Sequence, residues 1–196
     1  MTKPFKDTLT FQIPIRLIND WSKTVRVLEH SIGLVQAGKY TRDYKYSNYG
    51  HHYEIGSTGT VSHVTNGSNY WYAVAGPVVE STLPWLTQFK EDLQDLKPTF
   101  ATINKLIGHG AEHRDQVDQL TGFNYFFETS DSITYVKSLE YEEQYPSIAD
   151  TGWILDIQQP HRIANTGTRI WFNMRFGKPF AYCRDWFKDY RATVYE

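Results

Sequence analysis

Short segments with strand character recur through the second half of the chain, and this recurrence restricts the fold more than any other feature. They cover residues 100–107, 123–128, 133–139, 152–157 and 169–176. Several short strands separated by turn signals at near-regular spacing are typical of a barrel or a double-sheet jelly roll. We therefore predict a mainly β protein with a jelly-roll core.

Helices are expected at the two ends of the chain, outside this core. Residues 8–15 have the pattern of an opening strand, and Asn19 and Asp20 predict the cap of a helix that follows. A second helix is expected from Ser81 to Lys97, where Pro98 ends it. The chain has no internal repeat and no break in composition, so we expect a single domain over residues 1–196. Its parts are a support region of strand and helix over about 1–98, the jelly-roll core over about 99–180 and a C-terminal helix over about 181–190.

Composition and charge narrow the classes of function. The net charge is −2 and the pI about 6.4. This argues against a nucleic-acid partner, which needs clustered Lys and Arg, although a local basic groove would be compatible with it. Cys183 is the single cysteine, so an internal disulfide and a C-x-x-C motif are ruled out. Since no apolar run is long enough for a signal peptide or a membrane span, we expect a cytoplasmic protein without a membrane partner.

Three residues have the types and spacing of a metal site. Alternate side chains of a strand point to the same side, so His113 and Asp115 can reach one ion while Arg114 faces away. His161 must come from another strand end, which a jelly roll supplies. Two imidazoles and one carboxylate form the set that holds non-haem iron(II) and leaves coordination positions open for oxygen chemistry. Each residue alone is as readily a surface histidine or a turn aspartate, so the argument depends on the set.

A strand near the C-terminus adds a cation. Arg169, Trp171, Asn173 and Arg175 alternate with apolar residues and therefore share one face. That face looks either toward solvent, as in an ordinary sandwich, or into the lumen, which would place Arg169 beside the metal. The planar fork of an arginine can pair with a dicarboxylate ligand in bidentate fashion.

Together these residues carry a family resemblance. The motif His113-Arg114-Asp115, the segment FNYFF at residues 123–127 and the segment GWILDIQQPHRIANTGTR at residues 152–169 resemble the iron(II)- and 2-oxoglutarate-dependent oxygenases. The likeness is to the prolyl- and aspartyl/asparaginyl-hydroxylase-like members, including small bacterial and phage proteins, and it covers about residues 99–180. It implies a double-stranded β-helix core, the cupin-like jelly roll, with flanking α-helices. A phage-encoded protein of this type would act in the host cytoplasm.

The resemblance also implies roles for individual residues. Iron(II) would be held by three ligands, His113, Asp115 and His161, with no catalytic residue beyond them. Arg169 would pair with the distal carboxylate of the co-substrate 2-oxoglutarate. Asn124 or Tyr125 would supply a second co-substrate contact, and strand parity allows one of the two to face inward. Dioxygen is the other co-substrate implied, with ascorbate as a supporting reductant.

The reaction implied is hydroxylation of a C–H bond with release of succinate and CO2, and the expected substrate is a protein or peptide side chain. Residues 38–69 are rich in Tyr, Gly, Ser and Asn, and such loops often line ligand sites. The candidates for substrate contact are Tyr44, Tyr46, His52 and Trp71. Two alternatives stay open: an oxygenase acting on a small molecule or nucleobase, and a non-catalytic cupin-like protein that binds a metal or ligand. The oligomeric state is also open.

Other polar clusters are weaker candidates. His51 and His52 are adjacent, and adjacent side chains of a strand face opposite ways, so both cannot easily bind one ion. Three glutamates, Glu140, Glu142 and Glu143, form an acidic patch that we expect to be solvated surface.

Overall fold

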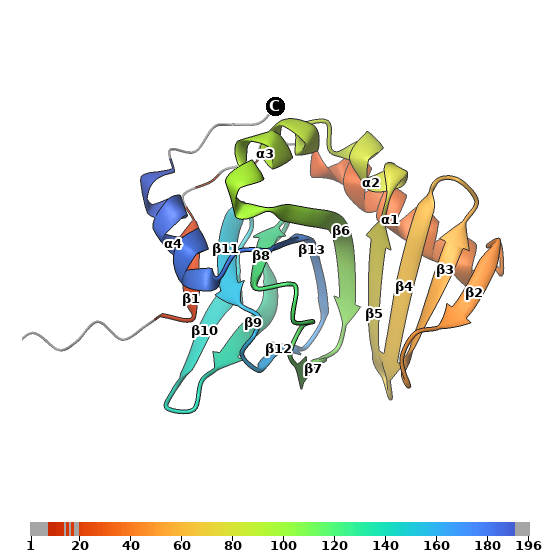
Figure 1. Ribbon diagram of the computed structural model, residues 1–196. Coiled ribbons are helices and arrows are strands. Elements are labelled where there is room, and N and C mark those ends of the chain that lie inside the picture. The colour runs from red at the N-terminus through yellow and green to blue at the C-terminus, as the bar shows by residue number, and fades with distance from the viewer. Residues whose placement is uncertain (1–7, 14, 16, 18–19, 191–196) are drawn as a thin grey trace, which may run out of the picture.

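The computed structural model describes residues 8–13, 15, 17 and 20–190. Their strands form two sheets in which all neighbouring strands are antiparallel (Figure 1). The larger sheet has nine strands in the order β1 (Thr10–Ile13), β11 (Thr151–Asp156), β8 (Thr121–Phe126), β13 (Thr168–Phe176), β6 (Pro98–Ile107), β5 (Asn69–Ala75), β4 (Gly59–Asn66), β3 (Gly50–Ile55) and β2 (Arg42–Lys45). The smaller sheet has four, in the order β10 (Glu142–Ser147), β9 (Ser130–Lys137), β12 (His161–Asn165) and β7 (Gly110–His113).

Helices cover one face of the larger sheet. They are α1 (Trp21–Gln36), α2 (Pro77–Thr82), α3 (Leu86–Asp92), which a 3-10 turn (Gln94–Leu96) follows, and α4 (Phe180–Asp189). In Figure 1, α1 and α2 lie against β3–β6, and α4 lies beside β1 and β11. No helix of the described chain is both long enough and apolar enough to cross a membrane.

The buried apolar side chains form two clusters, one on each side of the larger sheet. One lies under the helices and includes Leu28, Phe89, Phe123 and Phe172. The other lies between the two sheets and includes Phe126, Val136 and Trp171. Strand alternation explains the division, because Trp171 and Phe172 are neighbours on β13 and point to opposite faces. The predicted mainly β jelly-roll core with flanking helices is confirmed.

The structure differs from the expected elements in both halves of the chain, and in the second half β10 lies outside the expected strand segments. Residues 38–69, expected as short strands and loops, contain β2, β3 and β4, which with β5 continue the larger sheet beyond the core. The expected helix cap at Asn19 lies outside the described residues, but Asp20 accepts a hydrogen bond from the backbone N–H of Ser22 at 3.2 Å, as a helix cap does.

The expected helix start at Ser81 is wrong, because Ser81 and Thr82 instead belong to the end of α2. Their hydroxyls donate back to the carbonyls of Val78 and Val79, at 3.0 and 2.9 Å. Hydroxyl side chains often bond to the preceding turn in this way, and they are then not available to cap the next helix. The second helix expected from the sequence corresponds to α3, which begins at Leu86. Its apolar side packs into the core as predicted.

The acidic patch is not uniformly solvated. Glu143 Oε2 accepts hydrogen bonds from Leu9 N, Thr10 N and Thr10 Oγ1, at 2.9, 2.8 and 2.8 Å. This carboxylate therefore ties β1, at the edge of the larger sheet, to β10, at the edge of the smaller one. Glu142 pairs with Arg162 across the smaller sheet, and Glu140 is exposed.

Candidate metal centre and adjoining cleft

The expected metal ligands meet at one end of the jelly roll. His113 is the last residue of β7, and it lies opposite His161, the first residue of β12, in the register of that strand pair. Oδ1 of Asp115 lies 3.4 Å from Nε2 of His113 and 3.5 Å from Nε2 of His161. All three ligand atoms lie within 4.8 Å of one another, close enough to bind one ion.

Backbone carbonyls orient both imidazoles toward this point. Nδ1 of His113 lies 2.8 Å from the Ala111 carbonyl oxygen, and Nδ1 of His161 lies 3.0 Å from that of Gln159. Because a carbonyl only accepts, each Nδ1 must carry the proton, and in a neutral ring Nε2 then presents its lone pair to Asp115. Lone pairs and a carboxylate oxygen that face one another repel unless a cation or a proton lies between them. The donor set therefore fits a metal ion.

The other oxygen of Asp115 is occupied by an arginine. Oδ2 accepts from Nε of Arg175 at 2.5 Å, and the two side chains are 10% and 14% exposed. Burial opposes ionisation of Asp115. The hydrogen bonds that His113 and His161 donate when their imidazoles are protonated, together with the charge of Arg175, outweigh burial and hold the pKa of the carboxyl well below its usual range. The carboxylate is thus kept ionised, as a metal ligand requires.

Arg169 is buried deeper in the lumen, so the inward orientation of this strand face is the correct one. The residue is 1% exposed, and its guanidinium carbon lies 4.7 Å from the centre of the Phe126 ring and 4.4 Å from that of Trp171. Nη1 donates to Thr134 Oγ1 at 2.7 Å, whereas Nε and Nη2 have no hydrogen-bond partner among the described residues.

Such an environment is unfavourable for a cation. Burial lowers the pKa of Arg169 to about 10, with the nearby Tyr145 acting in the opposite direction, so the side chain is charged at neutral pH. A buried charge without a counter-ion is costly, which makes Arg169 a fitting partner for an anionic ligand.

One narrow cavity connects Arg169 with the metal centre. Its lining includes both histidines, Arg169, Thr134 and Asn124, and its volume is about 20 Å³. That is room for about one water molecule, so a five-carbon diacid would enter only if lining side chains moved aside.

Strand parity separates the two candidates on β8. Asn124 faces the lumen, where Asn173 Nδ2 donates to its Oδ1 at 2.6 Å and its Nδ2 donates to the Tyr145 hydroxyl at 2.8 Å. Tyr125 points to the opposite face, where its hydroxyl donates to the Leu17 carbonyl at 3.0 Å. Tyr125 is therefore a core residue, and Asn124 is the one that lines the cavity.

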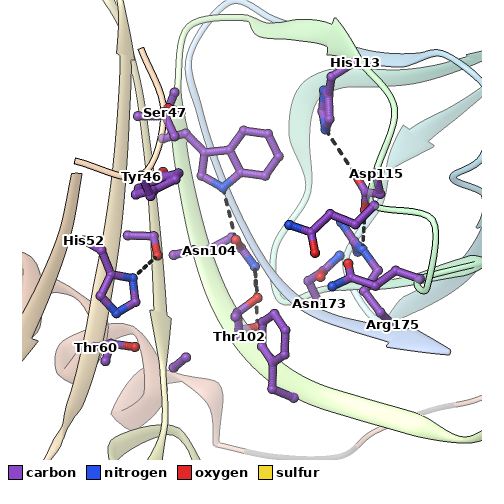
Figure 2. Close-up of a pocket in the computed structure, with 18 of the residues that line it drawn as sticks. Tyr46, Ser47, His52, Thr60, Thr102, Asn104, His113, Asp115, Asn173 and Arg175 are labelled. Carbon is purple, nitrogen blue, oxygen red and sulfur yellow. Dashed lines mark hydrogen bonds and ion pairs between the residues drawn. The ribbon is translucent and has the colours of Figure 1, made fainter. Parts of the chain in front are cut away.

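A larger cleft of about 980 Å³ opens beside the metal centre. Figure 2 shows Asp115, Asn173 and Arg175 on one side of it, with Tyr46, His52 and Thr60 across from them. Three of the four expected substrate residues line this cleft, namely Tyr46, His52 and Trp71. Tyr44 is not among the lining residues. It lies on edge strand β2, 40% exposed, with its ring 4.9 Å from that of His52.

Two arginines of the site were not assigned from the sequence. Arg175 shares the inward face of β13 with Arg169, so alternation could have identified it. Arg114 was expected to face away from the ligand residues, yet it lines the same cleft. The expectation is wrong because β7 ends at His113, and strand alternation does not continue to the next residue.

Known structures share this architecture. A 2OG-Fe(II) oxygenase family oxidoreductase from Burkholderia pseudomallei matches with a TM-score of 0.52 at 12% sequence identity, over 87% of this chain and 86% of the other. The chain has the fold of the 2OG-Fe(II) oxygenases. AviO1 from Streptomyces viridochromogenes Tue57 also matches, with a TM-score of 0.51 at 10% sequence identity, over 87% of this chain and 90% of the other. No family model and no curated protein sequence matches the chain. The resemblance expected from the sequence is confirmed at the level of the fold.

Proposed function

We propose that the protein is an iron(II)- and 2-oxoglutarate-dependent dioxygenase that hydroxylates a C–H bond of a protein or peptide side chain and releases succinate and CO2. One observation carries this proposal: the cavity lined by the two imidazoles also contains Arg169, a buried cation that forms no ion pair with another described residue. A co-substrate with a metal-chelating end and a distal carboxylate would satisfy both groups.

Each residue of the site would have a defined task. His113, Asp115 and His161 would hold iron(II) on one side, which leaves its remaining positions for the co-substrates. Arg169 would orient 2-oxoglutarate by pairing with its distal carboxylate. When bound, the iron, 2-oxoglutarate and dioxygen would supply the oxidising chemistry, which belongs to the cofactor more than to the protein.

Two alternatives differ from this proposal in observable ways. A cupin-like protein that binds a metal without turnover would have no use for Arg169 in the same cavity. An oxygenase acting on a small molecule is compatible with the cleft, since about 980 Å³ lies at the upper end of the range for small-ligand pockets.

The test is conversion of 2-oxoglutarate to succinate with iron(II) and ascorbate under air, which can be measured before the substrate is identified. We expect slow turnover by the wild type and none by Asp115→Ala or Arg169→Ala. Asp118→Ala is the matched control, because Asp118 is exposed, is close in sequence and does not line the cleft.

Binding is measured in parallel without oxygen. Iron(II) and 2-oxoglutarate together should give a weak visible charge-transfer band, which His161→Ala and Arg169→Ala should both abolish. A protein that gives neither this band nor a thermal shift with 2-oxoglutarate is not an oxygenase of this class.

A further inference from the structure

We propose that the cleft beside the metal centre binds an acidic peptide segment, and that Arg114 pairs with a carboxylate next to the residue that is oxidised. The inference rests on the function proposed above and names its substrate class. The floor of the cleft, its charge and its dimensions all support it.

The floor of the cleft is a sheet face that no helix covers. Alternate residues of β4, β5 and β6 form it, and the register places Ser62, Ala73 and Asn104 in one row and Thr60, Ala75 and Thr102 in the next. The helices α1 and α2 pack on the opposite face. Since the side chains in both rows are small or uncharged, the floor offers space and hydrogen-bonding groups without a competing charge.

The charge of the cleft is positive. Asp115 is the only acidic residue among the described residues that line it, and Arg175 already neutralises that carboxylate. Arg114 is exposed and makes no hydrogen bond or ion pair with another described residue. A free cation facing a cleft without a free anion favours a negatively charged ligand.

The position of Arg114 relates that negative charge to the reacting atoms. Arg114 stands between the proposed ligands His113 and Asp115, so its Cα lies about 3.8 Å from the Cα of each. Any carboxylate that it binds is therefore held within about one arginine side chain's length of the backbone that carries these ligands. The acidic residue of the substrate should accordingly be a near neighbour of the oxidised residue.

The dimensions and the single charge favour a peptide. The strands β3 to β6 span about 14 Å at a spacing of about 4.8 Å, which equals about four residues of extended chain. A nucleic acid would instead require several cations along its backbone, and Arg114 is the one unpaired lysine or arginine in the described lining of the cleft. At the rim, Phe100 is 59% and Tyr46 is 45% exposed, which leaves apolar surface for the flanking residues of a peptide.

The experiment measures binding by the zinc-loaded and the metal-free protein on an array of short synthetic peptides. Each peptide that contains Asp or Glu has a partner with Asn or Gln at the same position. The wild type should prefer the acidic member of each pair. Arg114→Ala should weaken binding of the acidic member about fivefold, as for a partly exposed ion pair, and leave its partner unaffected.

Charge reversal makes the test specific. Arg114→Glu should invert the preference, so that peptides with Lys in place of Glu bind more tightly than the acidic ones. Arg26→Glu is the matched control, since it changes the net charge equally but lies on α1, on the other face of the sheet. It should retain the wild-type preference.

Three outcomes would overturn the inference: equal binding of the paired peptides, tighter binding of a labelled oligothymidylate, or equal competition by free N-acetylglutamate, which would indicate a small acid. Because the readout is binding and needs no turnover, it separates this inference from the proposed function. An acidic preference that depends on Arg114, with neither succinate formation nor binding of 2-oxoglutarate, would leave a peptide-binding cleft and reject the oxygenase. Succinate formation without that preference would reject only the acidic peptide.

Discussion

Arg175 donates from Nε to Oδ2 of Asp115 at 2.5 Å, and this leaves Oδ1 of the carboxylate to face both imidazoles. A partner of this kind fixes the orientation of a metal ligand. We expect Arg175→Leu to bind zinc(II) about 10- to 100-fold more weakly than the wild type, as measured by isothermal titration calorimetry. Arg26→Leu should bind as the wild type does. An unchanged affinity in Arg175→Leu would show that Asp115 is positioned without its help.

The metal affinity should fall with decreasing pH, because a protonated imidazole cannot bind the ion. Burial alone would lower the pKa of His113, but the hydrogen bonds to Asp115 and to the Ala111 carbonyl outweigh it and raise the pKa above 6.5. Zinc affinity should therefore still increase above pH 6.5 and level off only above the raised pKa. A plateau reached at or below pH 6.5 would contradict this expectation.

Arg169 should contribute to ligand binding at the expense of stability. Methionine at this position removes the buried charge while retaining much of the length of the side chain. We expect Arg169→Met to lose 2-oxoglutarate binding while its free energy of unfolding stays equal or rises by up to about 2 kcal/mol, as measured in urea. Arg26→Met, at an exposed position of α1, should change that free energy by about 0.5 kcal/mol or less. A loss of several kcal/mol in Arg169→Met would mean that the contacts with Thr134 and the aromatic rings outweigh the desolvation.

Gly50 should control the position of Tyr46 at the end of the cleft. A Cβ at Gly50 would lie 2.5 Å from Cζ and the hydroxyl oxygen of Tyr46, so Gly50→Ala must displace that ring. Burial, together with the charge of Tyr53, raises the pKa of Tyr46 to about 12. We expect the displaced ring to titrate closer to pH 10 in an ultraviolet tyrosinate titration, with zinc affinity unchanged. Gly33→Ala is the control, because its added Cβ would meet nothing within 4 Å.

Glu143 should stabilise the fold by joining the edges of the two sheets. Glu143→Ala removes the acceptor of three hydrogen bonds from β1 and its flanking Leu9. We expect the free energy of unfolding in urea to fall by about 1–3 kcal/mol. Glu140→Ala removes an exposed glutamate of the same acidic segment and should leave it nearly unchanged. Equal effects of the two substitutions would show that the hydrogen bonds accepted by Glu143 add no stability.

The site was predictable from the sequence to the extent that it depends on strand alternation. The alternating pattern of β13 placed Arg169 and Arg175 on one face, and the convergence of His113, Asp115 and His161 followed from a jelly roll. Whether that face looked inward could not be predicted, because both faces of β13 carry large side chains and both are buried. For the same reason, the sequence could not show whether Asn124 or Tyr125 faces the lumen. The two residues lie on opposite faces of β8, but every residue of that strand is buried.

Features that depend on where a strand ends were harder to predict. Arg114 lines the cleft because β7 ends one residue earlier, at His113, and no local turn signal marks that end. Short strands were expected over residues 38–69, but the bounds of β2 to β4 could not be predicted, for a different reason. Neither face of β2 is buried and most of β3 and β4 is only half-buried, so their sequences lack the regular apolar alternation by which a strand is recognised.

Strand β13 carries the arginines of the proposed reaction centre, whereas the strands β3 to β5 line the cleft. This separation determines where the sequence can be changed without loss of the site. A slip of one residue in β13 would exchange its two faces, moving Arg169 and Arg175 into the helix-covered core and Phe172 into the lumen. An insertion or deletion in β13 would therefore disrupt the packing of the core and the arrangement of the site at the same time. Apart from Trp71, whose ring lies 6.0 Å from that of His113 and which also lines the cavity at the metal centre, the strands β3 to β5 carry cleft-lining side chains but none of the groups around the metal. The rest of their exposed face can therefore be randomised to seek new substrates without altering the reaction centre.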